Sequence, residues 1–161
     1  MSMRYILSII AAMVVLCTSA TAQNIRLGEK IPDVSVESTV GSDLKLVEQE
    51  YTCLIFMHSK CEPCETAIPH LHNAAAPLGE RLAIVLITHE DKEAEADITR
   101  KYGNYSSAIA FDRNRHTHKS FGINFVPFGV IYHTKSRRIE WFGSLQQLST
   151  AELTKICKTK K

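Results

Sequence analysis

Two cysteines three residues apart, Cys61 and Cys64, have the spacing of thiols that form and break a disulfide with each other. They follow a continuously apolar run and stand where a helix is expected to begin. A thiol at a helix N-terminus faces unpaired N–H groups and the positive end of the helix dipole, which favour the nucleophilic thiolate. Lys60 adds a positive charge, and Pro63 suits the first helical turn. We therefore expect Cys61 to attack a disulfide and Cys64 to resolve the mixed disulfide.

Other uses of these thiols remain open at this point. A zinc site usually needs two further Cys or His ligands, and the sequence holds neither a second CxxC pair nor an HxxxH pair. A copper-handling protein is the alternative interpretation, with Cys61, Cys64 and either His58 or His118 binding a soft cation. A peroxidase fits less well, because residues 58–60 replace the threonine-rich approach usual before a peroxidatic cysteine.

A second candidate element is Val126-Pro127, which stands directly before an apolar run. Proline is common at the first residue of a strand, and this is the purely structural interpretation. In a redox fold, the functional interpretation is a cis Val126–Pro127 bond that faces the cysteines and offers backbone groups to an extended substrate. Because most X–Pro bonds are trans, the sequence alone leaves both interpretations open.

Two buried strands and a helix are expected to position the cysteines. Residues 52–57 and 82–87 are continuously apolar, as in strands covered on both faces. Residues 62–76 between them are typical of a helix, so the two strands should pair in parallel. Upstream, residues 34–36 and 44–47 alternate apolar and polar side chains, which predicts a hairpin.

The rest of the chain alternates helices and strands. A charged helix is expected at residues 91–102, with a left-handed cap at Gly103. The elements expected after it are a strand at 108–111, a helix at 115–121, antiparallel strands at 128–132 and 138–142, and a helix capped by Ser149. This order predicts an α/β fold, with a mixed central sheet flanked by helices on both faces.

The first 22 residues are typical of a secretory signal peptide, with one Arg, a short apolar run and small residues before Gln23. Lipid attachment at Cys17 is less favoured, because the bulky Leu16 precedes it. Residues 23–161 are then expected to form a single domain that works in the periplasm or otherwise outside the cytoplasm. The net charge of +2 gives no reason to expect a nucleic-acid partner.

The strand into Cys61 and Cys64, Pro69 in the following helix and Val126-Pro127 downstream resemble the thioredoxin superfamily. Within it, the sequence is most similar to the exported ResA/TlpA-like thiol–disulfide oxidoreductases. The resemblance implies a thioredoxin-like fold without a cofactor, in which Pro127 is the cis proline. It also implies two kinds of partner, namely exported proteins with disulfides and a membrane or soluble electron donor or acceptor.

The sequence departs from that family around the cysteines. Lys60 replaces the usual Trp, Ile55 replaces a buried Asp of thioredoxin, and Ala67 replaces a Glu of the ResA-like helix. Neither usual proton acceptor for the resolving thiol is therefore present. Glu65, His70 or water could take that proton, although Glu65 and His70 are expected at the surface.

The other cysteines and histidines have structural interpretations. Cys53, inside an apolar strand, is expected to be an inert buried thiol, and Cys157 to pack at the edge of the core. A Cys53–Cys157 disulfide stays open, since it depends on geometry. On a helix, residues two apart diverge, so the histidine pairs at 70/72 and 116/118 are expected to be solvated rather than to share a metal.

The leading hypothesis is an exported thiol–disulfide oxidoreductase that uses its Cys61-Glu62-Pro63-Cys64 segment as a dithiol reductase on protein substrates. No dimerisation segment is evident, so a monomer is expected and isomerase activity is less favoured. An oxidase remains an alternative, because Lys60 and the helix dipole would stabilise the thiolate and thereby the reduced form.

Overall fold

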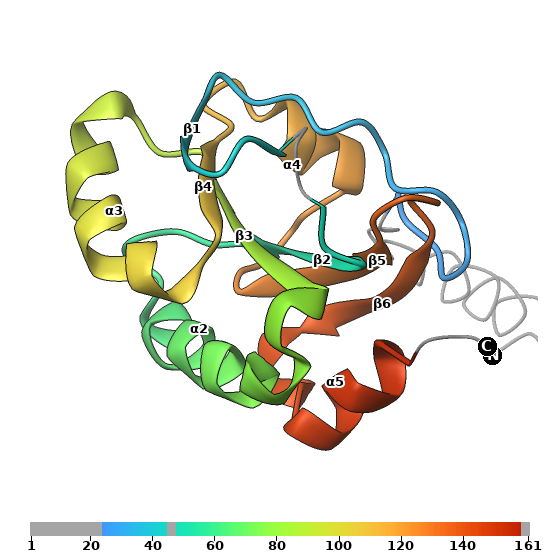
Figure 1. The fold of residues 1–161 in the computed structure, drawn as a ribbon. Coiled ribbons are helices and arrows are strands. Elements are labelled where there is room, and N and C mark those ends of the chain that lie inside the picture. The colour runs from blue at the N-terminus through green and yellow to red at the C-terminus, as the bar shows by residue number, and fades with distance from the viewer. Residues whose placement is uncertain (1–23, 45–47, 159–161) are drawn as a thin grey trace, which may run out of the picture.

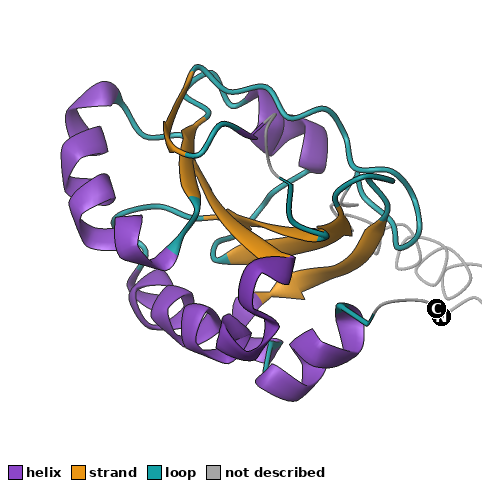
Figure 2. Ribbon diagram, in the orientation of Figure 1, coloured by secondary structure: helices purple, strands orange, loops and turns teal. Residues whose placement is uncertain are grey.

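The computed structural model describes residues 24–44 and 48–158, which form a sheet of six strands with helices on both faces (Figures 1 and 2). Across the sheet the order is β1-β4-β3-β2-β5-β6. The bounds are β1 Ser38–Gly41, β2 Tyr51–Phe56, β3 Leu82–Thr88, β4 Ala108–Phe111, β5 Phe128–His133 and β6 Ile139–Ser144. β2, β3 and β4 run parallel, and the other strands are antiparallel to their neighbours. The predicted mixed α/β sheet is confirmed.

The helices divide between the two faces. α2 (Glu62–Ala75), α3 (Glu95–Tyr102) and α5 (Thr150–Ile156) cover one face, and α4 (His116–Phe121) lies on the other (Figure 1). Short 3-10 segments occupy Ala76–Arg81, Lys92–Ala94, Gly103–Tyr105 and Leu145–Gln147. No helix in the described ranges has the length and apolarity needed to cross a membrane. The predicted signal peptide at residues 1–22 lies outside the described residues.

The central strand β2 explains why its sequence is apolar throughout. Its side chains alternate between two hydrophobic clusters, one under each layer of helices. Cys53 and Ile55 face the cluster that contains α2, whereas Leu54 and Phe56 face the cluster that contains Phe121 of α4. All four side chains are at most 1 % exposed. Burial on both faces therefore requires a run without polar alternation, as the sequence predicts.

The predicted hairpin between residues 34–36 and 44–47 is wrong. Residues 34–36 form no strand, and β1 instead pairs antiparallel with β4, placing Val40 opposite Ile109. Val34 and Val36 pack against the cluster on the α4 face, so their alternation reflects an extended segment lying on the sheet. Residues 45–47, in the second strand of the predicted hairpin, lie outside the described residues.

The helix predicted for residues 91–102 also differs in detail. A 3-10 turn precedes α3, which begins only at Glu95. Gly103 has a φ of −56° and is right-handed, so the predicted left-handed cap is wrong, and the chain continues into a second 3-10 turn. The Ser149 cap is confirmed, because its hydroxyl accepts a hydrogen bond from the backbone N–H of Glu152 at 3.2 Å.

Two glycine substitutions test this packing. Gly129→Ala in β5 should lower the free energy of unfolding by about 1–3 kcal/mol, because a Cβ there would lie 2.6 Å from Leu145 and 3.0 Å from Trp141. Gly103→Ala should be neutral or stabilising by up to about 1 kcal/mol, because its backbone is already helical and a Cβ would meet only Thr99 at 3.9 Å. Urea denaturation of both variants measures the difference, and equal effects would contradict the described packing.

Candidate active site

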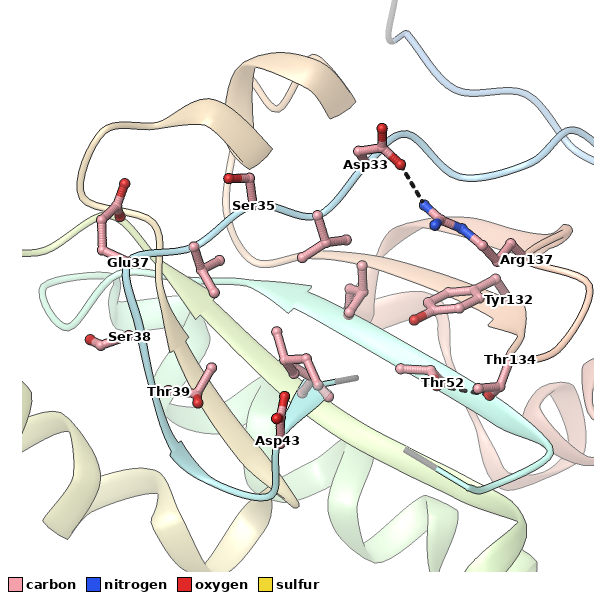
Figure 3. Close-up of a pocket in the computed structure, with 15 residues that line it drawn as sticks. Asp33, Ser35, Glu37, Ser38, Thr39, Asp43, Thr52, Tyr132, Thr134 and Arg137 are labelled. Carbon is pink, nitrogen blue, oxygen red and sulfur yellow. Dashed lines mark hydrogen bonds and ion pairs between the residues drawn. The ribbon is translucent and has the colours of Figure 1, made fainter. Parts of the chain in front are cut away.

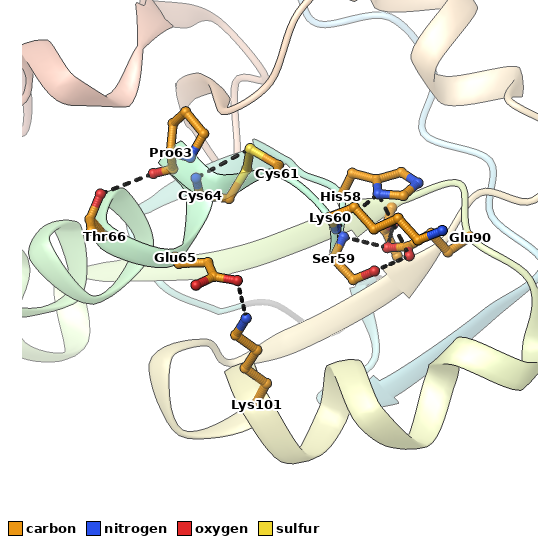
Figure 4. The surroundings of a disulfide bond; sticks show 11 residues. His58, Ser59, Lys60, Cys61, Pro63, Cys64, Glu65, Thr66, Glu90 and Lys101 are labelled. Atoms are coloured by element: carbon orange, nitrogen blue, oxygen red, sulfur yellow. Dashed lines mark hydrogen bonds and ion pairs between the residues drawn. A yellow bond between two sulfur atoms is a disulfide. The ribbon is translucent and has the colours of Figure 1, made fainter.

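Cys61 and Cys64 lie at the start of α2 and are joined by a disulfide, with their Cα atoms 5.3 Å apart (Figure 4). Cys61 is the N-cap of the helix, and its Sγ accepts a hydrogen bond from the backbone N–H of Cys64 at 3.2 Å. Cys61 is partly exposed, whereas Cys64 is completely buried. An approaching disulfide can therefore reach only Cys61 of this pair.

The loop before Cys61 is held by Glu90, a residue that the sequence analysis missed. The Glu90 carboxylate accepts hydrogen bonds from the Ser59 backbone N–H at 2.7 Å, from the Ser59 hydroxyl and from the Thr88 hydroxyl at 3.0 Å (Figure 4). Burial opposes its ionisation, but the hydrogen bonds from Ser59 and Thr88 prevail and lower the pKa of Glu90. The only signal in the sequence is an acidic residue just beyond a buried strand.

A second polar pair, Asp112 and His118, is buried beside this edge of the sheet. Asp112 is completely buried and accepts hydrogen bonds from the backbone N–H groups of Thr117 at 3.2 Å and His118 at 2.8 Å. Its Oδ2 also lies 2.7 Å from Nδ1 of the His118 ring. His116 is exposed as predicted, but the prediction of a solvated His118 is wrong, because this side chain is only 8 % exposed.

Three imidazoles form a row at the carboxyl ends of the parallel strands. His58 follows β2 and His89 follows β3, with ring centroids 5.3 Å apart. The His118 ring lies 5.0 Å from that of His89. Burial lowers the pKa of both His89 and His118. The row thus links the loop before Cys61 to the buried Asp112.

The Val126–Pro127 peptide bond is cis and leads directly into β5. Val126 is partly buried and packs against both hydrophobic clusters. Cys61 packs against one of them, the cluster that contains α2. Phe128, the first residue of β5, is 1 % exposed. The two candidate elements of the sequence, the cysteine pair and Val126-Pro127, therefore converge on one core cluster.

The surroundings of Cys64 are apolar. Ile55 is completely buried and Ala67 is 6 % exposed, and both belong to the same hydrophobic cluster as Cys64. Glu65 and His70 are exposed, as predicted. The Glu65 carboxylate pairs with the Lys101 ammonium at 2.5 Å on the surface (Figure 4).

Cys53 and Cys157 are free, completely buried thiols, and no disulfide joins them. Burial raises the pKa of both thiols, that of Cys157 to about 11. Because the thiolate is the reactive form, these two residues are poor nucleophiles at neutral pH.

The ligand set of the copper alternative is not gathered within the described residues. No group of three or more His, Cys, Asp or Glu side chains in these ranges is placed to hold a metal ion. Nδ1 of His58 instead accepts a hydrogen bond from the Lys60 backbone N–H at 3.1 Å, and Nδ1 of His118 faces Asp112.

A separate cavity of about 710 Å³ lies between residues 33–39 and the sheet (Figure 3). Thr52 and Thr134 share a hydrogen bond of 2.9 Å in it, and Arg137 pairs with Asp33 at 3.2 Å. Thr52 stands near the start of β2 and Cys61 beyond its end, so this cavity lies at the other end of the strand from the disulfide.

The buried histidines predict a dependence of stability on pH. Unfolded histidines bind a proton near pH 6.5, whereas burial keeps His118 and His89 neutral to lower pH in the folded chain. The free energy of unfolding should therefore fall as the pH drops from about 7 to about 5. His118→Asn should make this fall shallower in urea denaturation, and the exposed matched control His116→Asn should not. Equal slopes for wild type and His118→Asn would contradict the assignment.

Comparison with solved structures confirms the thioredoxin-like fold. A thioredoxin-like protein in its oxidized form is 15% identical with a TM-score of 0.68, covering 83% of this chain and 97% of that one. StoA from Bacillus subtilis is 19% identical with a TM-score of 0.60, covering 81% of this chain and 100% of its own. A reduced 2-Cys peroxiredoxin from Plasmodium vivax is 15% identical with a TM-score of 0.63, covering 81% and 93%.

A comparison with curated proteins gave no match. A family comparison did, since residues 27–139 match the AhpC/TSA family. The match spans β1 to the start of β6 and includes Cys61, Cys64 and Val126-Pro127. The chain therefore belongs to the AhpC/TSA family, with the thioredoxin-like fold that the resemblance of its sequence implied.

Proposed function

We propose that the protein is an exported thiol–disulfide oxidoreductase that reduces disulfides of other exported proteins. The observation that carries this function is the asymmetry of the disulfide, in which Cys61 is partly exposed and Cys64 is buried. The family and the fold support thiol chemistry at this position. Export rests on the signal-peptide pattern of residues 1–22.

The reaction starts from the reduced form, with Cys61 as a thiolate. The backbone N–H of Cys64 and the start of α2 stabilise the negative sulfur of Cys61. Cys61 attacks one sulfur of the substrate disulfide, forming a mixed disulfide and releasing the other substrate sulfur as a thiolate that takes up a proton.

Resolution follows from Cys64. Its thiol loses a proton to water and attacks the Cys61 sulfur, which closes the Cys61–Cys64 disulfide and releases the second substrate thiolate. Two electrons have then passed from the chain to the substrate. A dithiol donor, soluble or in the membrane, reduces the disulfide of this chain and is itself oxidised. Ile55 and Ala67 leave no carboxylate at the two positions where the resemblance implied a proton acceptor for Cys64.

Replacement of the resolving thiol tests these roles. Reduced Cys64→Ala should accumulate a mixed disulfide with a protein substrate, because Cys61 can still attack but nothing resolves the product. Cys61→Ala should accumulate none, and Cys53→Ala, which removes a buried thiol, should retain turnover. Non-reducing electrophoresis with mass spectrometry measures the adducts. An adduct through Cys64 in the Cys61→Ala variant would contradict the assigned roles.

One similar structure is a peroxiredoxin, so peroxide reduction is a second activity to test. The same assay therefore also measures the consumption of hydrogen peroxide. Wild type should reduce the protein disulfide faster than it consumes hydrogen peroxide at equal concentration. Faster consumption of peroxide would contradict the proposed substrate class while leaving Cys61 as the nucleophile.

Export makes a separate prediction about the N-terminus. The protein recovered from the extracytoplasmic fraction of the producing cell should begin at Gln23. Signal peptidase favours small residues three positions and one position before the cut, and here these are Ala20 and Ala22. Intact-mass measurement identifies the N-terminus, and a chain that starts at Gln23 behind a new Met should stay in the cytoplasm as the control. An exported chain that retains Met1 would contradict cleavage at this position.

A further inference from the structure

A hollow of about 460 Å³ opens beside the loop that leads to Pro127. Its lining includes one residue just after β3, three from α4 and its N-cap, and two from the loop, namely His89, Arg115, His118, Lys119, Phe125 and Val126. It adjoins the cysteine end of the sheet. The ring of His58, three residues before Cys61, lies 5.3 Å from that of His89, and Val126 packs on the same cluster as Cys61.

The hollow carries positive charge. Arg115 and Lys119 are both exposed, and no carboxylate stands among the described residues that line it. Two acidic groups stand behind the histidines of the hollow. Asp112 is completely buried and is engaged by the backbone of α4 and by His118, and Glu90, next to His89, is held by Ser59 and Thr88. Cationic side chains around a concave surface favour an anionic ligand.

His118, which lines the hollow, also has an unused hydrogen-bond acceptor. A carboxylate only accepts, so Nδ1 of a neutral His118 donates to Asp112, and its Nε2 is left as an acceptor. This Nε2 is buried and has no hydrogen-bond partner among the described residues, and the same holds for Nδ1 of His89. Buried polar atoms without partners are costly, so a ligand with an N–H group would be stabilised here.

An exposed aromatic ring borders these polar groups. Phe125 is 49% exposed and makes an edge-to-face contact with Phe128, with ring centroids 5.2 Å apart. The adjacent Val126 adds apolar surface to the same wall. A ligand that matches the whole hollow therefore combines a negative charge, an N–H donor and an apolar side chain.

We propose that this hollow binds an acidic, partly apolar polypeptide segment that flanks the disulfide of the protein substrate. A substrate Asp or Glu pairs with Arg115 and Lys119, a peptide N–H donates to Nε2 of His118, and an apolar side chain packs on Phe125. This subsite rests on the proposed disulfide reduction and adds to it a preference for acidic substrates.

Two matched peptide disulfides test the subsite. They are identical, with a Leu near the cysteine, except that one carries Glu where the other carries Gln. Reduced wild type should react with the Glu peptide about fivefold faster in second-order rate constant at low salt, as two exposed ion pairs allow. High salt should remove the difference, because it screens exposed charges.

Charge variants locate the effect. The double variant Arg115→Gln/Lys119→Gln should react at equal rates with the two peptides. The matched control Arg26→Gln/Lys155→Gln loses the same charge from exposed positions outside the hollow and should keep the wild-type preference. Thermal unfolding of both double variants verifies that they are folded.

The outcomes separate the subsite from the proposed function. Equal, fast reduction of both peptides by wild type would overturn the subsite and leave disulfide reduction intact. No reduction of either peptide would overturn the proposed function itself. Glutathione disulfide is the third substrate, since it carries carboxylates and N–H groups without a polypeptide. Wild type could reduce glutathione disulfide faster than both peptides, and Arg115→Gln/Lys119→Gln could lose this advantage. That result would contradict the proposal that the hollow binds a polypeptide.

Discussion

The position of Cys61 as the N-cap of α2 is the constraint on which the active site depends. Its sulfur accepts a hydrogen bond from the Cys64 N–H, so one residue ends the loop, starts the helix and presents the proposed nucleophile. The site is fixed on both sides of this residue. Glu90 holds the loop through Ser59, and the buried face of α2 anchors Cys64 against Ile55. Exposure of one thiol and burial of the other follow directly from this arrangement.

Features set by local sequence could be predicted. The apolar run of β2, the helix after it and the Ser149 cap each depend on neighbouring residues, and the structure confirms them. Features set by contacts across the sheet could not. Val40 pairs with Ile109, far along the chain, because the edge of β4 offers unpaired backbone groups. No local pattern distinguishes that pairing from a hairpin.

The same reason explains the missed polar residues of the site. Glu90 meets Ser59 only because β3 lies beside β2 in parallel register, which brings their carboxyl ends together. His118 reaches Asp112 because α4 turns back over the end of β4. At the level of sequence, both residues are ordinary surface candidates. In the fold, these residues and the row of imidazoles give a polar edge to a sheet whose interior is apolar throughout.

The most direct test of the account is the equilibrium reduction potential of the Cys61–Cys64 couple, measured against glutathione or dithiothreitol buffers. A protein that reduces disulfides should show one two-electron transition below about −200 mV, and Cys64→Ala should abolish it. A potential near about −120 mV, typical of a strong oxidant, would contradict the reductive direction. The absence of any transition would contradict the thiol chemistry altogether.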